Sequence, residues 1–368
     1  MDAADLRASI PATGRCTYLN TGATGPSPRQ VVDATADFEE RLQYEAPCRE
    51  GPYEVALGAK ESARESVADF LGADPTEIAL TRNTVEGVNV VANGLDWESG
   101  DVVVRTDLEH PAGRLPWERL AREQGVEVRV LETDRGRVDL DVLATLAADA
   151  KLVCCSSLCW NYGTRLPVAE IVEVAHDAGA RVLVDAVQSV GQAPVDVREW
   201  GADFVAASGH KWLLGPWGAG FLYVDGDALD ALSPDRIGYF SVDDPGADDY
   251  EYDPGAKRFE LGTTAVAPYV GLERAIDLVE AVGVETVQSR IRDLAGRLVD
   301  GLGDRRLGAE PPESGLVPFE TADPEETVAS LEADGIHIRA IPEPEACRAS
   351  VHAFNTEAEV DALLAALG

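Results

Sequence analysis

The sequence predicts an α/β fold, with a mostly parallel central sheet covered by helices and a smaller α+β C-terminal domain. Short apolar runs alternate with helix-like segments from about residue 60, which is typical of a parallel sheet with crossover helices. The runs are almost continuously apolar, which indicates strands covered on both faces. With 368 residues, the chain is long enough for two domains.

The expected elements follow in chain order. Residues 61–72 form an amphipathic helix that ends in glycine. Helices fit between most of the strands that come next. The expected strands are 77–81, 101–106, 127–131, 151–156, 181–185 and 204–207.

After Gly262 the pattern changes. We expect a long helical stretch over 267–301, then two strand-like segments at 335–341 and 348–354. Thr356 and Glu359 form a capping box for the final helix. We therefore expect a large domain over 16–262 and a small one over 263–368, with 1–15 packed on the small one.

The composition is strongly acidic. Sixty-six Asp and Glu against 31 Lys and Arg give a formal net charge of −35. This charge disfavours nucleic acid and a membrane surface as partners. There is no apolar run of about 20 residues, and the N-terminus does not resemble a secretory signal, so we expect a cytoplasmic protein. So many acids with only four lysines suggest adaptation to a salt-rich cytoplasm.

The six cysteines do not predict disulfides or a metal site. Disulfides are rare in the cytosol, and no cysteine or histidine pair stands at zinc-binding spacing. We interpret the cysteines as small apolar residues.

Polar residues that could carry chemistry follow the expected strands. Ligands of an open parallel sheet bind beyond the carboxyl ends of its strands. Thr84 there opens a helix, and His110, Asp185 and the SGHKW stretch that contains Lys211 follow other strands. Each is weak evidence alone, because such residues are common as caps or on the surface. A lysine kept in a lysine-poor chain nevertheless suggests that a deprotonable amine is needed.

The combination fits pyridoxal phosphate, which needs a lysine, a phosphate site and an acid against its pyridine nitrogen. The sequence resembles the class V aminotransferase group of fold-type-I pyridoxal-phosphate enzymes, which includes cysteine desulfurases, selenocysteine lyases and epimerase-like members. The resemblance runs from YLNTGATGPSP at residue 18 to CRASVHAFNTEAEVD, which ends at residue 361. Its most specific element is VDAVQSVG followed by SGHKW.

The resemblance implies three catalytic residues. Lys211 would form the aldimine and later carry the Cα proton, and Asp185 would keep the pyridine nitrogen protonated. His110 would stack on the cofactor ring. Gln188 would donate a hydrogen bond to the phenolic oxygen of the cofactor.

The resemblance also implies which residues bind the cofactor phosphate, and that one of them comes from the other subunit. Thr84, Ser208 and His210 would hold the phosphate, together with backbone N–H groups near Val85, where the family often has a second Thr. Thr263, in a stretch that resembles the RFE-x-GT motif, would reach the phosphate of the other subunit. This implies an obligate homodimer with shared active sites.

On the substrate side, Arg348 would grip the α-carboxylate of an amino acid. Asn20 lies in a segment that resembles the substrate-side N-terminal segment of the family. In the WNYG stretch, alignment on Gly163 places Trp160 or Asn161 near the cofactor oxygen, and we name Asn161.

The reaction type is less constrained. The resemblance implies an external aldimine and removal of the α-proton, with aminotransferase-type chemistry leading and a cysteine-independent C–S or C–Se lyase or an epimerase as the alternative. A sulfur-transferring desulfurase is disfavoured, because the segment between Arg339 and Arg348 is short and stiffened by two prolines. Strand alternation also points Cys347 away from Arg348.

Two alternative interpretations, a different class of enzyme and a protein without activity, are disfavoured. A dehydrogenase would need a glycine fingerprint where TRNTVEG stands. A non-catalytic scaffold would be expected to have lost Lys211 or Asp185, and both are present.

Overall fold

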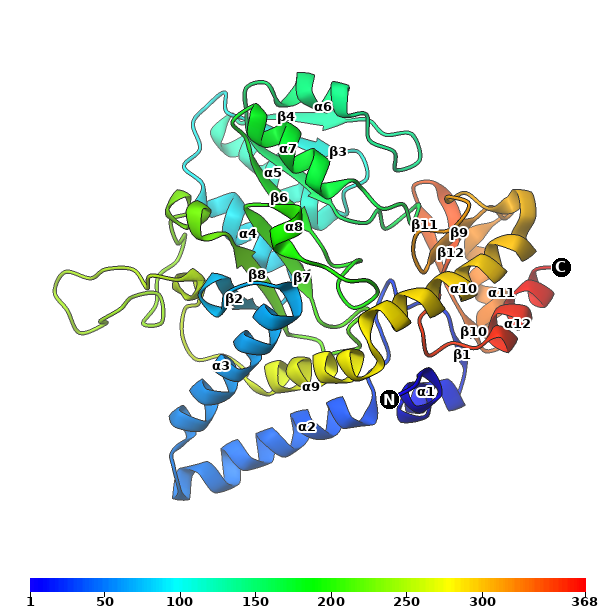
Figure 1. Ribbon diagram of the computed structural model, residues 1–368, viewed down its shortest axis with the longest axis horizontal. Coiled ribbons are helices and arrows are strands. Elements are labelled where there is room, and N and C mark those ends of the chain that lie inside the picture. The colour runs from blue at the N-terminus through cyan, green and yellow to red at the C-terminus, as the bar shows by residue number, and fades with distance from the viewer.

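The computed structural model describes all residues, 1–368, and is built around a seven-stranded sheet. Figure 1 shows how the helices surround it. The strand order is β2-β8-β7-β6-β5-β3-β4. β8 is antiparallel to both of its neighbours, and the other pairs are parallel. The strands are β2 (Ile78–Thr81), β3 (Val102–Thr106), β4 (Glu127–Leu131), β5 (Ala150–Ser156), β6 (Arg181–Asp185), β7 (Phe204–Ser208) and β8 (Gly220–Val224).

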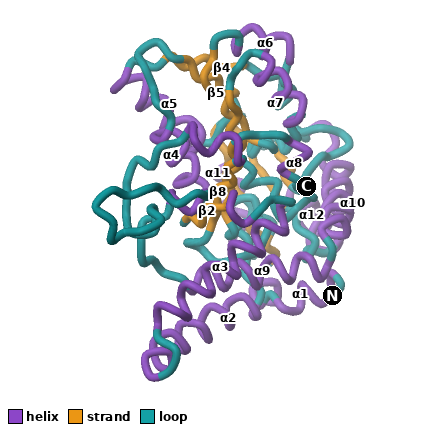
Figure 2. The backbone as a smooth tube through the Cα atoms, turned by 60° about the vertical axis from the view of Figure 1, so that its left-hand side comes forward, coloured by secondary structure: helices purple, strands orange, loops and turns teal.

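Both faces of this sheet are buried, as the apolar runs predict. Along β6, Val182 and Val184 enter one core cluster, whereas Leu183 between them enters another. The first face is covered by α3 (Pro52–Leu71), α6 (Leu140–Ala147), α7 (Val168–Asp177), α8 (Val197–Trp200) and α9 (Ala267–Val282). The second is covered by α4 (Thr84–Gly94) and α5 (Pro111–Gln124). Figure 2 shows the strands with α4 and α5 on one side and α6, α7 and α8 on the other. α2 (Arg29–Glu40) packs against α9.

The C-terminal part has its own sheet and core. β11 (Arg339–Pro342), β12 (Glu345–Ser350) and β9 (Leu316–Phe319) form an antiparallel sheet in that order. β1 (Thr17–Tyr18) pairs with β10 (Ile336–His337). The helices of this part are α10 (Val284–Leu302), α11 (Pro324–Ala333) and α12 (Glu357–Leu367).

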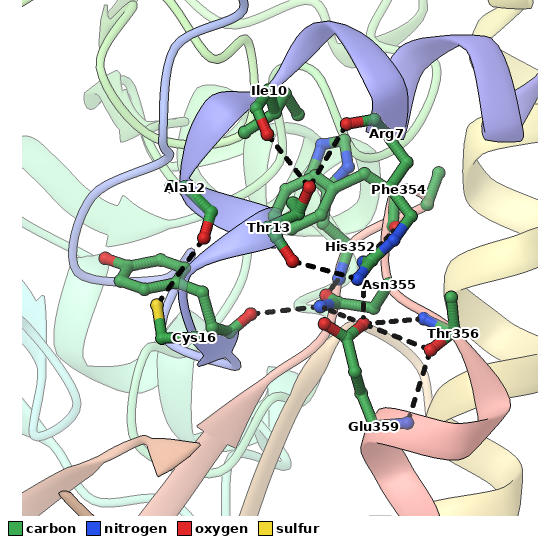
Figure 3. A network of polar contacts seen from close by, with 12 residues as sticks. Arg7, Ile10, Ala12, Thr13, Cys16, His352, Phe354, Asn355, Thr356 and Glu359 are labelled. Atoms are coloured by element: carbon green, nitrogen blue, oxygen red, sulfur yellow. Dashed lines mark hydrogen bonds and ion pairs between the residues drawn. The ribbon is translucent and has the colours of Figure 1, made fainter. Parts of the chain in front are cut away.

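The first helix, α1 (Ala3–Ser9), lies against the end of the chain. The Arg7 guanidinium donates to Glu359 at 2.9 Å and to the carbonyl of Phe354 at 3.1 Å (Figure 3). Leu6 and Ile10 are buried in the same cluster as Phe354. The N-terminal helix is therefore held against residues 354–359. The same cluster also contains Leu158, Trp212 and Leu214, so the packing of 1–15 on the small domain stays a prediction.

Several boundaries differ from those expected. The first helix of the alternating region begins at Pro52, because proline is well suited to a first helical turn. The stretch 267–301 is two helices, broken at Gly283, where φ is +88°. The C-terminal segments are shifted, with β12 starting at Glu345. The capping box of Thr356 and Glu359 is confirmed.

Two further findings bear on the sequence expectations. The division into two domains at residue 262 stays a prediction. Helix α9 lies after this position in the sequence, yet it packs on the large sheet. All six cysteines are free, and four of them are buried. Adjacent Cys154 and Cys155 enter cores on opposite faces of the sheet. None of the helices is both long and apolar enough to cross a membrane.

Candidate active site

A cavity of about 240 Å³ lies at the carboxyl ends of the parallel strands, against the small C-terminal sheet. The structure brings most of the predicted site residues into its wall, although they come from distant parts of the chain. The predicted residues that line it are Thr84, Val85, His110, Asp185, Gln188, Ser208, His210, Lys211 and Arg348.

Lys211 follows β7 and projects an amine into this cavity without an ion-pair partner. Burial lowers its pKa to about 8, assisted by Arg348 and Arg339 and opposed by Asp185. The backbone around it is closely packed: a Cβ on Gly25 would lie 2.1 Å from the Lys211 carbonyl oxygen. The backbone that carries this side chain is therefore held in place, and the amine can lose its proton near neutral pH.

Asp185 ends β6 and is almost fully buried. Its Oδ1 accepts a hydrogen bond from the Val187 N–H at 3.0 Å. Burial raises its pKa, opposed by that hydrogen bond and by Lys211. A buried carboxylate with so few donors is suited to pair with a cationic ligand atom.

The N-terminus of α4 borders the cavity and is suited to hold an anion. The N–H of Thr84 donates to Ser208 Oγ at 2.7 Å, and the two hydroxyls are also 2.7 Å apart. Thr84, Val85 and Ser208 all border the cavity. The first N–H groups of a helix and its dipole favour an anion such as phosphate. His210 borders the same end, with its pKa lowered to about 4 by burial and by Lys211.

His110 caps α5 and faces Trp160. Its Nδ1 accepts from the Ala112 N–H at 3.3 Å. The His110 ring meets the Trp160 indole edge-on, with centroids 5.6 Å apart. Burial and three nearby cations lower the pKa of His110 to about 4, so the ring is neutral at pH 7 and able to stack on a flat ligand.

Gln188 has its amide held at both ends. Its Oε1 accepts from Trp212 Nε1 at 2.7 Å, and its Nε2 donates to the carbonyl of Gly22 at 3.0 Å. The amide orientation is therefore determined, and one N–H of Nε2 remains for a ligand oxygen.

Arg348 is buried in β12 with no carboxylate partner. Its Nη1 donates to the carbonyl of Trp160 at 2.7 Å, whereas Nε and Nη2 have no acceptor in the protein. Burial lowers its pKa to about 9, with a further contribution from Arg339. The free Nε–Nη2 edge of the guanidinium is the bidentate face that a carboxylate fits.

Three predicted residues lie elsewhere. Asn161 has its amide occupied by Cys159 Sγ and by the carbonyl of Glu343, and Trp160 takes the place in the cavity wall that we expected for Asn161. The backbone turn at 160–161 decides this, and spacing from Gly163 could not. Asn20 bridges to Ser350 next to the cavity without lining it. Thr263 is exposed and lies outside the cavity of its own chain.

Arg339 was not predicted as a site residue, and Gly22 lies in the predicted substrate-side segment 20–23, from which we named only Asn20. Arg339 borders the cavity and pairs directly opposite Arg348 across β11 and β12. Two like charges at directly paired positions destabilise a hairpin unless a ligand binds them. Pairing the two strand segments in the sequence would therefore have pointed to Arg339. Gly22 lies where a Cβ would come within 2.9 Å of Arg348 Nη2 and Ser350 Oγ.

Comparison with known proteins agrees with this geometry. The profile described as Aminotransferase class-V matches residues 17–363. The chain belongs to the class V aminotransferase family. A probable cysteine desulfurase of Methanothermobacter thermautotrophicus is 36% identical, over 98% of this chain and 96% of the relative.

Two solved structures are similar along almost their whole length. One is the cystine C–S lyase C-DES in complex with its reaction product cysteine persulfide, with a TM-score of 0.92 and 32% identity over 97% of this chain and 98% of that one. The other is a C-DES variant with glycine covalently linked to its pyridoxal phosphate, with a TM-score of 0.93 and 32% identity over 98% of each chain.

The cofactor of the chain is pyridoxal phosphate, and the residues present fit it. The cavity combines a buried amine, a buried carboxylate, an anion site at a helix N-terminus and a neutral aromatic ring. Its wall also has an unpaired guanidinium edge. These groups match an aldehyde, a pyridine nitrogen, a phosphate, a flat ring and a substrate carboxylate.

Proposed function

We propose that this chain is a pyridoxal-phosphate-dependent lyase that cleaves the C–S bond of a cysteine-derived amino acid such as cystine, with no protein thiol as sulfur acceptor. Its relatives carry names of C–S-cleaving enzymes. Aminotransferase-type chemistry, which was the preferred interpretation of the sequence, has no such support from the names of these relatives.

The observation that carries the proposal is the position of Cys347. It neighbours Arg348 in β12 but points to the opposite face, where it is buried in the core of the small part. Its Sγ lies 3.5 Å from the carbonyl oxygen of Pro324. The sequence reading that this thiol points away from Arg348 is confirmed.

The hairpin around Cys347 is also tight. Pro342 pairs with Glu345, so only residues 343 and 344 form the turn. A segment this short has no slack to carry a thiol into the cavity. No cysteine lines the cavity at all. Sulfur released there therefore has no cysteine of the same chain beside it to accept it.

The residues of the chain then have separate tasks. Bound pyridoxal phosphate supplies the electron sink that stabilises negative charge at Cα. Lys211 would hold the aldehyde carbon, later accept the Cα proton and return a proton to the product. Asp185 would keep the pyridine nitrogen protonated, and His110 would cover the ring. Arg348 would orient the α-carboxylate.

The reaction balances with water as the only co-reactant. Lys211 takes the Cα proton, and the Cβ–S bond breaks with its electron pair going to sulfur. Cystine plus water gives cysteine persulfide, pyruvate and ammonia. No external oxidant or reductant is needed.

We also propose a homodimer. Thr263 lies outside its own cavity, next to a surface pocket that contains Tyr53 and Leu57, two of the exposed large apolar side chains. In a dimer, Thr263 of each protomer would reach the phosphate end of the other cavity. Sedimentation of the holoenzyme should give twice the mass of the chain.

The experiment compares products across substrates. The holoenzyme is incubated with cystine, cysteine and alanine, and pyruvate, ammonia, persulfide and pyridoxamine phosphate are measured. We expect stoichiometric pyruvate, ammonia and soluble persulfide from cystine. Lys211→Ala should abolish them, and Cys347→Ala should retain them. Keto acid with pyridoxamine phosphate, or loss of activity in Cys347→Ala, would contradict the proposal.

A further inference from the structure

Trp160 has a buried N–H with no acceptor in the protein. Its indole forms part of the cavity wall, and Nε1 is inaccessible to solvent. Leaving a buried donor unpaired costs about 1–3 kcal/mol, so such a group is expected to find an acceptor in the bound state. Of the other indoles, those of Trp212 and Trp97 donate within the protein, whereas the buried Nε1 of Trp117 also lacks an acceptor but does not line the cavity.

Trp160 also determines how Arg348 is presented. Its carbonyl oxygen accepts from Arg348 Nη1, and its ring lies 6.0 Å from the guanidinium carbon. These two contacts restrain one end of the guanidinium and leave the Nε–Nη2 edge free. The side chains of Trp160 and Arg348 are thus neighbours in the cavity wall, and each carries an N–H with no acceptor in the protein.

The indole also packs against His110. The His110 ring stands at 85° to it, with the two ring centroids 5.6 Å apart. The ligand therefore meets Trp160 between His110, which would cover the cofactor ring, and Arg348, which would hold the carboxylate.

We propose that Trp160 is a substrate-binding residue whose indole N–H donates to the substrate α-carboxylate beside Arg348. The carboxylate would then accept three hydrogen bonds, two from Arg348 and one from Trp160. The inference deepens the proposed function, because it defines how the same site selects an amino acid with a free carboxylate. It does not depend on which bond of the substrate is later broken.

The test uses glycine, which has no side chain to eliminate and so measures binding alone. Glycine and glycinamide are titrated into the Trp160→Phe holoenzyme, and the change in cofactor absorbance gives each dissociation constant. Phe keeps an aromatic ring and the backbone carbonyl but lacks the N–H. We expect about a tenfold weaker affinity for glycine, as befits one hydrogen bond to a charged group. The affinity for glycinamide, which lacks the carboxylate, should stay within about twofold.

The control is Trp97→Phe, which removes an indole distant from the cavity and should change neither constant. Unchanged glycine affinity in Trp160→Phe, or an equal loss for both ligands, would overturn the inference. So would a changed absorbance spectrum before any ligand is added, because the N–H would then face the cofactor. A chain that bound glycine as expected but released no pyruvate from cystine would refute the proposed lyase and leave this inference standing.

Discussion

The indole Nε1 of Trp212 donates to Oε1 of Gln188 at 2.7 Å, so the residue after Lys211 sets the orientation of an amide in the cavity wall. Trp212 is itself held by the small part of the molecule. The His352 ring stacks on it at 5.9 Å, and His352 Nε2 lies 3.0 Å from its carbonyl oxygen. The two parts of the chain therefore meet directly behind the cofactor site.

We predict that Trp212→Phe weakens binding of pyridoxal phosphate by about three- to tenfold, since one hydrogen bond contributes about 0.5–1.5 kcal/mol. Without the indole donor, only the bond to the Gly22 carbonyl holds the Gln188 amide, so its N–H is presented less firmly to the phenolic oxygen of the cofactor. Equilibrium dialysis of the cofactor, with Trp97→Phe alongside, measures this. Equal affinities in the two variants would refute the prediction.

The pKa of Lys211, lowered to about 8, should control cofactor uptake. Only the neutral amine attacks an aldehyde, so the uptake rate of the apo-protein should rise with pH and level off above pH 8. In Arg339→Gln a nearby cation is lost, the protonated amine is less disfavoured, and the midpoint should move up. In Asp185→Asn the midpoint should move down. Stopped-flow absorbance across pH 6–10 gives these midpoints, and parallel shifts in both variants would be inconsistent with this electrostatic origin.

Gly22 should be required for carboxylate binding. A Cβ there would meet Leu316 Cδ2 at 2.4 Å and Arg348 Nη2 at 2.9 Å. Gly22→Ala should therefore displace the guanidinium and weaken glycine binding at least tenfold. Gly58→Ala, where a Cβ meets nothing within 4 Å, is the matched control. Calorimetric melting of both variants separates a local effect from a folding defect.

Glu109 should make stability depend on pH. This buried carboxyl accepts from Thr106 Oγ1, Ser156 N–H and Ser156 Oγ, yet burial raises its pKa from 4.5 to about 7. Because the folded state then binds the extra proton, stability falls as pH rises from about 4.5 to 7. In Glu109→Gln this part of the slope should vanish. Denaturant unfolding at pH 5 and pH 8 tests it, and an unchanged slope would show that other groups dominate.

The net charge of −35 predicts dependence on salt. Repulsion among the surface carboxylates is screened by added ions, so the melting temperature should rise between dilute buffer and molar potassium chloride. Equal melting temperatures in both would remove the case for adaptation to salt.

Much of this arrangement could be predicted from the sequence, because it depends on local patterns. The apolar runs predicted both ends of β4 and of β6 correctly. The motif around Lys211, together with Asp185, indicated the cofactor chemistry. Strand β8 was not expected, because its glycine-rich approach looks like a loop and it pairs antiparallel to its neighbours. One of its partners, β7, is near in the sequence, but nothing local shows that β2, more than a hundred residues earlier, pairs with its other edge.

The cavity wall was harder to predict than the sheet. Whether Trp160 or Asn161 faces the ligand depends on one turn, which is fixed when the Asn161 amide donates to the carbonyl of Glu343. The role of Gly22 depends on a contact with a residue more than 300 positions away. Long-range packing, rather than spacing along the chain, decides these positions.

The fastening of Arg7 to Glu359 has a consequence for the opening residues (Figure 3). The same N-terminal segment goes on through β1, paired with β10, to Gly22 in the cavity wall. This segment therefore connects the final helix to the cavity wall. Deleting the first residues of the chain should leave the large sheet folded but weaken the binding of an amino acid.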